Sequence, residues 1–262
     1  MTTTLVRRAG VLTLIAATAT ALSGCAGVIG ATMTYDDTEK AKITDIVLSG
    51  ASGDVHITTA PVSQTTIKRV IRRTTNPGES YHLAGTTLSL DTSCGVDCSV
   101  SYEIQTPAGV NVSGHLESGD VRLDGVGKTD VQVSSGDISV VNAAGPVRVT
   151  ATSGDIEVLQ AKSTVTVAST SGDIRAIDPA GAVDIRATSG DVQVHLTTPN
   201  SITCRVSSGD VDVSVPAGDY KVVSHDNNSG DTWLHGLVSN PAAKNVLDIQ
   251  TSSGDVNVGT TA

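Results

Sequence analysis

The stretch Ser118-Gly119-Asp120-Val121 opens a phrase that recurs through the second half of the chain. It returns, with Val or Ile in its fourth position, at Ser135, Ser153, Ser171, Ser189 and Ser208. From one aspartate to the next, the steps are 17, 18, 18, 18 and 19 residues. A fixed period of this size is typical of a solenoid, in which each repeat is one supersecondary unit that buries its apolar side only against its neighbours.

Each repeat contains two short segments with strand character. After the aspartate comes an apolar-polar-apolar triplet such as Val121-Arg122-Leu123, and before the next Ser-Gly-Asp comes a second alternating run such as Val131-Gln132-Val133. Alternation with a period of two, carried by β-branched residues, indicates strands. Glycine supplies a positive φ at the turn between them, and the Ser and Asp oxygens can accept hydrogen bonds from backbone N–H groups.

Composition agrees with a thin core of stacked Val and Ile. The chain has no Phe and a single Trp, although 39% of its residues are hydrophobic. The repeat therefore predicts an all-β fold, namely a right-handed, single-stranded β-solenoid similar to a parallel β-helix, with coils of about 18 residues.

Stacked coils would place the recurring aspartates in a line along one edge of the solenoid. The column comprises Asp54, Asp120, Asp137, Asp155, Asp173, Asp191, Asp210, Asp231 and Asp255. Like charges at such a spacing repel unless hydrogen bonds or cations compensate them. Turn N–H groups and hydroxyls could neutralise a purely structural ladder, or calcium could, as in glycine-rich nonapeptide solenoids. Because each coil supplies only one aspartate, the structural ladder is favoured, and we predict no cofactor and no metal site, with calcium as the alternative.

The two ends of the chain depart from the regular period. Strands over 43–48, 54–58, 66–72, 87–90 and 99–104 are longer and less regular than the later ones. Terminal repeats of a solenoid are atypical because they close the open end of the core. We therefore predict one β-solenoid domain over 41–262, with irregular N-terminal coils over 41–110 and regular Ser-Gly-Asp repeats over 111–262.

Residues 1–24 have the features of an export signal. Arg7 and Arg8 precede a short apolar run, which ends in Leu22-Ser23-Gly24-Cys25. This ending resembles the bacterial lipoprotein cleavage box, in which the cysteine receives diacylglycerol, is further acylated with fatty acids such as palmitate, and becomes the new N-terminus. The alternative is an ordinary signal peptide with an incidental cysteine. We predict lipidation of Cys25, a lipidated tether over 25–40, and anchoring to the outer face of the bacterial cell membrane.

Charge excludes one class of partner. Removing a signal segment with two arginines and no acids changes the net charge from −10 to −12. Nucleic acid and anionic lipid repel so acidic a chain, so no nucleic-acid partner is expected. One basic cluster interrupts the acidic pattern, at Lys68, Arg69, Arg72 and Arg73. It could contact an anionic wall polymer or a lipid headgroup, or it could be a solvated strand face that pairs with acids.

Three cysteines and the single tryptophan complete the candidate residues. Cys94 and Cys98 are four apart in a chain with an export signal, which favours a disulfide; a metal site would need further ligands nearby. Cys204 falls in an inward-facing column and is expected to be a buried free thiol. Trp233 takes an outward position, where it could stack on a sugar or a partner, or be covered by the insertion at 238–240.

The repeated phrase, together with the Cys94-Gly-Val-Asp-Cys98 loop and the run over 102–109, resembles a bacterial family that goes by the name putative adhesin. The family is a domain of unknown function, common in exported and lipid-anchored proteins, and the resemblance covers 43–258. It implies a β-solenoid and supplies no catalytic residues.

No nucleophile elbow, phosphate loop, zinc-protease helix or paired-carboxylate cleft is evident in the sequence, so we predict no enzymatic activity. The favoured hypothesis is a lipid-anchored, extracytoplasmic module for surface adhesion or interaction, with a protein or cell-wall polymer as partner. One alternative is a cell-envelope sensor or accessory lipoprotein that acts with a membrane partner. Another is a carbohydrate-active β-helix enzyme.

Overall fold

The computed structural model describes residues 31–73, 80–223 and 229–261, which consist of strands, turns and loops. The chain divides into two units, Met1–Gly30 and Ala31–Ala262, and the fold described below is that of the second. The predicted signal segment and the lipidation site Cys25 lie outside the described residues. None of the described segments forms a helix that could cross a membrane.

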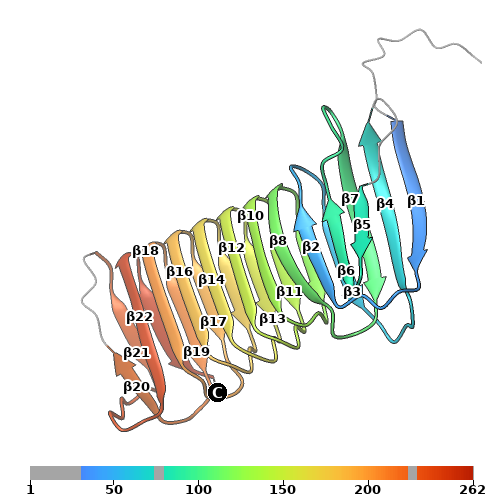
Figure 1. The fold of residues 1–262 in the computed structure, drawn as a ribbon. Helices are drawn as coiled ribbons and strands as arrows, with labels where there is room; N and C mark the ends of the chain where they lie inside the picture. Colours follow the sequence, from blue (N-terminus) through green and yellow to red (C-terminus); the bar gives the residue numbers. More distant parts are fainter. Residues whose placement is uncertain (1–30, 74–79, 224–228, 262) are drawn as a thin grey trace, which may run out of the picture. The chain divides into compact units, whose positions relative to one another are not determined.

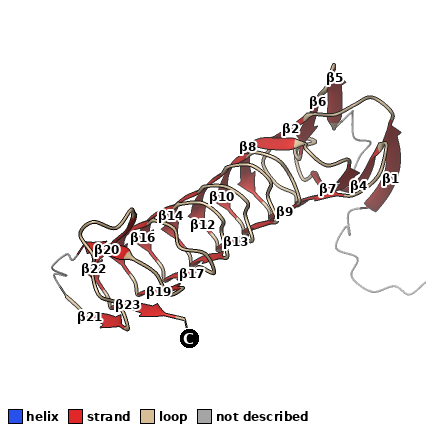
Figure 2. Ribbon diagram, turned by 90° about the horizontal axis from the view of Figure 1, so that it is seen from below, coloured by secondary structure: helices blue, strands red, loops and turns tan. Residues whose placement is uncertain are grey.

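The strands form two sheets that face each other across the core (Figures 1 and 2). The twelve-stranded sheet has the spatial order β1 (Ala31–Glu39), β4 (Thr65–Arg73), β7 (Ser99–Thr106), β3 (Val55–Thr59), β9 (Val121–Asp124), β11 (Ile138–Val141), β13 (Ile156–Leu159), β15 (Ile174–Ile177), β17 (Val192–His195), β19 (Val211–Val215), β23 (Val256–Thr260), β21 (Thr232–His235). The eleven-stranded sheet has the order β20 (Tyr220–Val223), β22 (Asn245–Ser253), β18 (Ile202–Ser208), β16 (Val183–Ser189), β14 (Val165–Ser171), β12 (Val147–Ser153), β10 (Thr129–Ser135), β8 (Asn111–Ser118), β2 (Asp45–Ser49), β6 (Thr87–Asp91), β5 (Tyr81–Ala84).

Each regular coil contributes one strand to each sheet. In the coil that begins with β10, seven residues run along the eleven-stranded sheet, the chain turns at Gly136-Asp137, and β11 adds four residues to the twelve-stranded sheet. Successive coils stack in parallel and in register, so Val140 lies beside Val158 and Val149 beside Val167. These Val side chains are fully buried and form the thin core between the sheets. The predicted all-β solenoid is confirmed.

The N-terminal end contains the antiparallel strands. β4 pairs antiparallel with β7, β1 pairs antiparallel with β4, and β5 pairs antiparallel with β6. β1 includes most of the residues predicted as a tether over 25–40, and that boundary was wrong. Ala31–Glu39 contains the alternating run Thr32-Met33-Thr34-Tyr35 and pairs with the edge of β4 through nine residue pairs. The folded unit therefore begins at Ala31.

At both ends, the order of coils in space differs from their order in the chain. The coil of β2 and β3 lies between the coil of β6 and β7 and the coil of β8 and β9. In the same way, the last strands of the chain, β22 and β23, lie between the coil of β18 and β19 and the coil of β20 and β21. The last coil of the chain is thus inserted one position in from the end of the stack.

Candidate functional site: the aspartate ladder and its groove

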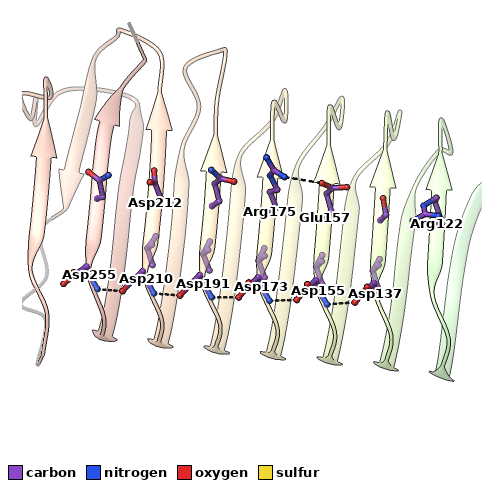
Figure 3. A pocket seen from close by; sticks show the side chains of 18 residues that line it. Arg122, Asp137, Asp155, Glu157, Asp173, Arg175, Asp191, Asp210, Asp212 and Asp255 are labelled. Atoms are coloured by element: carbon purple, nitrogen blue, oxygen red, sulfur yellow. Dashed lines mark hydrogen bonds and ion pairs between the residues drawn. The ribbon is translucent and has the colours of Figure 1, made fainter.

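The recurring aspartates form a continuous hydrogen-bonded ladder along one edge of the stack (Figure 3). The backbone N–H of each aspartate donates to the Oδ1 atom of the aspartate in the neighbouring coil, at 2.8 to 3.2 Å. In spatial order the ladder is Asp54, Asp120, Asp137, Asp155, Asp173, Asp191, Asp210, Asp255 and Asp231. Ser101 takes the aspartate's place before the first member, because its Oγ accepts the N–H of Asp54 at 3.1 Å.

The glycine of each Ser-Gly-Asp turn allows the coils to approach this closely. Gly154 has a φ of 124°, and a Cβ atom built on it would lie 2.1 Å from the carbonyl oxygen of Gly136 in the neighbouring coil. The same contact repeats along the stack up to Gly230, whose Cβ would lie 2.0 Å from the carbonyl oxygen of Gly254. Only glycine has both the backbone freedom and the missing side chain that this column requires.

Each ladder carboxylate from Asp54 to Asp255, in this spatial order, therefore has a defined structural partner. Its Oδ1 atom accepts the backbone N–H of the aspartate in the neighbouring coil. The described residues include no group of three or more His, Cys, Asp or Glu side chains arranged to hold a metal ion. The geometry is that of a turn ladder, with one carboxylate for each coil.

A shallow groove of about 700 Å³ follows the ladder across the outer face of the twelve-stranded sheet (Figure 3). The ladder forms one wall, and the opposite wall is the row of outward side chains Arg122, Ser139, Glu157, Arg175, Gln193, Asp212 and Asn257. Eight carboxylates and two guanidinium groups line the groove, so it is strongly acidic. The Nη1 atom of Arg175 lies 3.9 Å from the Oε1 atom of Glu157, and this ion pair joins neighbouring coils within the row.

Trp233 continues this row on β21, next to Asn257. Its side chain is 43% exposed. The insertion after β21 packs elsewhere, because the Ser239 hydroxyl accepts the N–H of Val222 at 3.1 Å and Asn240 donates its N–H to the Tyr220 carbonyl at 2.8 Å. Of the two arrangements that the sequence left open, the structure has the exposed tryptophan.

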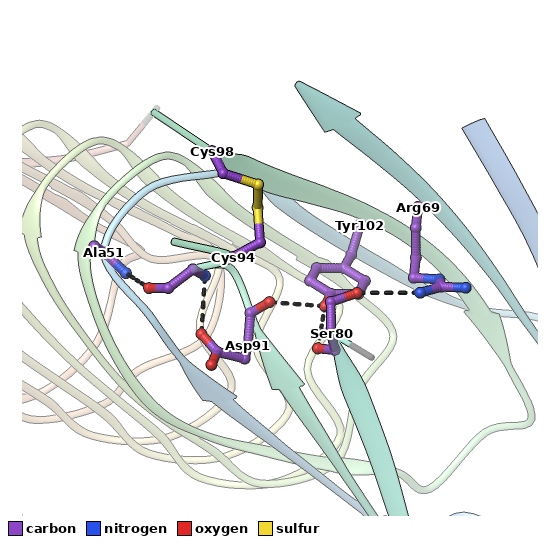
Figure 4. The surroundings of a disulfide bond; sticks show 8 residues. Ala51, Arg69, Ser80, Asp91, Cys94, Cys98 and Tyr102 are labelled. Carbon is purple, nitrogen blue, oxygen red and sulfur yellow. Dashed lines mark hydrogen bonds between the residues drawn. A yellow bond between two sulfur atoms is a disulfide. The ribbon is translucent and has the colours of Figure 1, made fainter. Parts of the chain in front are cut away.

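Cys94 and Cys98 form a disulfide in the loop that leads into β7 (Figure 4). The loop is tied to the rest of the fold through Ser93, whose Oγ accepts the Ala51 N–H at 2.7 Å and whose N–H donates to Asp91 Oδ1 at 2.8 Å. The loop and disulfide thus lie at the N-terminal end of the stack, away from the groove.

Tyr102 is the largest buried side chain in this region. Its hydroxyl lies against the carbonyl oxygens of Ser80 and Asp91, 2.8 Å from the latter (Figure 4). Burial raises the pKa of Tyr102 to about 12, because a phenolate would be poorly solvated there.

The predicted basic cluster is divided between the two faces of β4. Arg69 shares the inward face with Ile67 and Ile71, stacks between the rings of Tyr35 and Tyr81 at 5.1 and 5.0 Å, and donates to Asp37 at 2.8 Å. Lys68 faces outward and pairs with Glu103 at 2.9 Å, which raises its pKa. Arg72 is exposed, and the Arg73 side chain lies outside the described part of the structure.

The inward position of Arg69 was not predicted from the sequence. The signal was present, however, in the period-two run Ile67-x-Arg69-x-Ile71, which puts the guanidinium on the apolar face.

Cys204 occupies the inward column, between Ile185 and Ile249 on the neighbouring strands. It is a fully buried free thiol, and burial raises its pKa to about 12. A thiol held in the protonated form and out of contact with solvent does not act as a nucleophile.

Two stacked, mainly parallel sheets joined by this ladder define a β-solenoid protein. The model of the family described as Toastrack DUF4097 matches residues 27–181 and 160–259, so the chain belongs to this family. The resemblance seen in the sequence is thereby confirmed at the level of the family.

A crystal structure described as that of a putative adhesin from Bacteroides fragilis superposes with a TM-score of 0.54 at 14% identity, covering 90% of this chain and 100% of that one, and it shows a shared fold. A putative cell adhesion protein from Clostridium sporogenes (TM-score 0.28, 11% identity, 87% and 100% covered) and a putative adhesin from Parabacteroides merdae (TM-score 0.33, 8% identity, 88% and 96% covered) are more distant. No curated protein matches the chain.

Proposed function

We propose that this chain is a lipid-anchored, extracytoplasmic β-solenoid that serves as a surface adhesion module and performs no catalysis. Cys25 carries the lipid, at the outer face of the bacterial cell membrane. The folded unit begins at Ala31, six residues later. A segment of that length spans at most about 20 Å, so the solenoid stays near the membrane, where it meets protein or cell-wall polymer partners.

The observation that carries this proposal is the groove along the ladder. It crosses the coils from Arg122 to Asn257 and offers a repeating row of polar side chains rather than one enclosed pocket. A long, open, periodic surface suits contact with an extended partner. The relatives described as adhesins support the same class of function.

The same groove argues against the carbohydrate-active alternative. None of the described residues that line it is aromatic, whereas sugar subsites commonly use aromatic faces for stacking. The sensor or accessory alternative needs a membrane partner, and no feature of the described residues favours it over adhesion.

The anchor is tested by Cys25→Ser in the native bacterium. We expect the protein to move from the membrane fraction to the medium and to lose metabolic labelling by palmitate. Retention of the Cys25→Ser protein in the membrane would contradict the anchor.

Adhesion is tested by displaying the chain on a non-adherent bacterium and measuring attachment to isolated cell walls and to cells of the native species. The groove variant Ser139→Lys with Gln193→Lys changes its charge at two outward positions. Thr152→Lys with Thr188→Lys, exposed positions on the eleven-stranded sheet, is the matched control. We expect attachment above that of undisplayed cells, altered by the groove pair and unchanged by the control. No attachment, or an equal effect of both pairs, would overturn the proposal.

A further inference from the structure

β1 lies at the N-terminal side of the twelve-stranded sheet without contributing to its core (Figure 1). It is the outermost of the described strands in the order of this sheet and pairs with β4 along nine residue pairs. None of residues 32–39 is fully buried. β4, by contrast, also pairs with β7 and buries Ile67 and Ile71 completely. Because local stability rises with the apolar area that a segment buries, β1 is held much less firmly than β4.

The side chains that hold β1 in place make polar or aromatic contacts. Arg69 of β4 donates to Asp37 at 2.8 and 3.0 Å and lies 5.1 Å from the centroid of the Tyr35 ring. From β5, the Tyr81 hydroxyl donates to Glu39 at 3.2 Å. The Asp37 side chain is 34% exposed, and Tyr35 is 37% exposed. Ion pairs and hydrogen bonds that solvent can reach contribute little net stability, so these contacts position β1 but hold it only weakly.

β4 has the features of an edge strand, although β1 and β7 flank it on both sides. Natural edge strands avoid wrong pairing through basic side chains and through a charge on their inward face. β4 carries Lys68, Arg69 and Arg72 within five residues. Arg69 is the inward charge, on the same face as Ile67 and Ile71. A strand protected in this way suits exposure of its edge, which indicates a second state in which β1 has left it.

We propose that β1 is a releasable strap, held on β4 by its contacts with Arg69. The strap leaves β4 as a unit while the rest of the solenoid stays folded, and it returns by pairing with the same edge. In the docked state, Ala31–Glu39 belongs to the stack. In the released state, the first fixed residue is Ile43, which is buried in the core. Residues 40–42 between them are exposed and form the hinge.

Release leaves no buried charge without a partner. Two of the groups that cover the Arg69 guanidinium, Tyr35 and Asp37, belong to β1 itself. When they leave, water reaches the guanidinium, and Ser80 and Tyr81 remain beside it. The backbone groups of β4 that pair with β1 then lie on an exposed strand edge, where water satisfies them.

The consequence for the anchor rests on the proposed lipidation of Cys25. With β1 docked, the six residues from Cys25 to Ala31 span at most about 20 Å. With β1 released, the 18 residues from Cys25 to Ile43 span at most about 60 Å. Tension between the anchor and a bound partner favours the longer state, so the strap lets an adhering module move away from the membrane without unfolding.

Hydrogen exchange of the full-length chain in mild detergent tests the release. The measurement needs no membrane, so its failure is distinct from a failure of the lipid anchor. We expect the paired amides of β1 and the β4 amides that face them to exchange through one shared opening. This opening should be at least about a hundredfold more frequent than that of β7. Gradual fraying from Ala31 toward Glu39, or protection of β1 equal to that of β7, would overturn the proposal.

A disulfide staple tests whether exchange requires the strand to leave. Thr34 and Val70 are partners on β1 and β4, and partners in an antiparallel pair lie within disulfide reach. In a Cys204→Val background, Thr34→Cys with Val70→Cys should slow the exchange of β1 to the rate of β7 once mass spectrometry shows the bond. Reduction should restore the fast exchange. Exchange that the closed staple leaves unchanged would overturn the strap.

Matched aspartate variants test what holds the strap. Asp37→Ala removes both bonds to Arg69 and should make the opening about fivefold more frequent, with the midpoint of global unfolding unchanged. Asp36→Ala, at the exposed neighbouring position, is the control and should change the opening by less than about twofold. Equal effects of the two variants, or a matching loss of global stability with Asp37→Ala, would contradict a strap held by Arg69.

Discussion

The backbone N–H of Asp255 donates a 2.8 Å hydrogen bond to the carboxylate of Asp210, although Asp231 lies between them in the sequence. Asp231 in turn donates to Asp255, at 2.9 Å. The last Ser-Gly-Asp repeat of the chain is therefore inserted into the stack instead of being added to its end. It takes the same ladder position as the regular repeats, so the ladder is a property of neighbouring coils in space and not of consecutive segments.

The glycine column should be the least tolerant part of the repeat. Gly154→Ala brings a Cβ to 2.1 Å from the Gly136 carbonyl oxygen at a φ of 124°, so we expect a loss of roughly 3 kcal/mol or more in the free energy of unfolding. Gly85→Ala is the matched control, since Gly85 has a φ of 62° with open space around it, and should cost only about 1 kcal/mol. Urea denaturation measures both; equal losses would show that close stacking is not what selects glycine.

The ladder should depend on an acceptor oxygen and not on charge. Asp155→Ala removes the acceptor for the Asp173 N–H and should cost about 1 kcal/mol of stability. Asp155→Asn keeps an acceptor and removes one of a column of like charges, so it should equal or exceed the wild type in stability at low salt, with less gain at high salt. Chemical denaturation at both salt levels tests this. A loss with asparagine as large as with alanine would mean that the carboxylate charge itself is needed.

Calcium should have little effect on stability. The described residues contain no group of three side chains that could bind a metal ion, and the ladder places only one carboxylate in each coil. We expect the melting temperature of the chain to differ by no more than about 2 °C between excess calcium and chelator, with magnesium as the control for ionic strength. A large rise specific to calcium would indicate that a cation occupies the ladder.

Stability should fall in strong alkali as Tyr102 ionises. Because burial raises its pKa to about 12, above the usual value near 10, the folded state favours the neutral phenol. The stability that the neutral phenol contributes is fully present below pH 10. As the pH rises through 12, the free energy of unfolding should fall by up to about 3 kcal/mol.

Tyr102→Phe isolates this effect from the other tyrosines. The variant loses the hydrogen bond to the Asp91 carbonyl, so below pH 10 it should be less stable than the wild type by about 1 kcal/mol. Above pH 10 the difference should shrink and then reverse, since phenylalanine cannot ionise. A difference in the free energy of unfolding between the wild type and the variant that stays constant from pH 9 to 12 would rule out this role for Tyr102.

Much of the regular solenoid could be predicted from the sequence. The alternation around Val121-Arg122-Leu123 and the period near 18 residues set the inward columns, and Cys204 was correctly placed in one of them. These features are local or strictly periodic, so the strands predicted in one coil are supported by the same pattern in the next coil. The five strands predicted over 43–104 were also found, with boundaries within two residues, whereas β5 (Tyr81–Ala84) was not predicted.

What could not be predicted depends on contacts between segments far apart in the chain. The insertion of β23 between β19 and β21 leaves the repeat phrase itself unchanged, so no local pattern reveals it. In β1 the apolar alternation is confined to Thr32–Tyr35, and the strand extends to Glu39 by pairing along the edge of β4. The groove arises from the registration of single outward residues, such as Glu157 and Arg175, that vary from coil to coil.

A pair of engineered disulfides can test the spatial order of the last coils. Asp212 and Asn257 are partners on neighbouring strands, about 4.8 Å apart and within disulfide reach, whereas Asp212 and Trp233 are two strands apart. In a Cys204→Val background, we predict that Asp212→Cys with Asn257→Cys crosslinks on mild oxidation and that Asp212→Cys with Trp233→Cys does not. A crosslink in the second pair and none in the first would contradict the inserted coil.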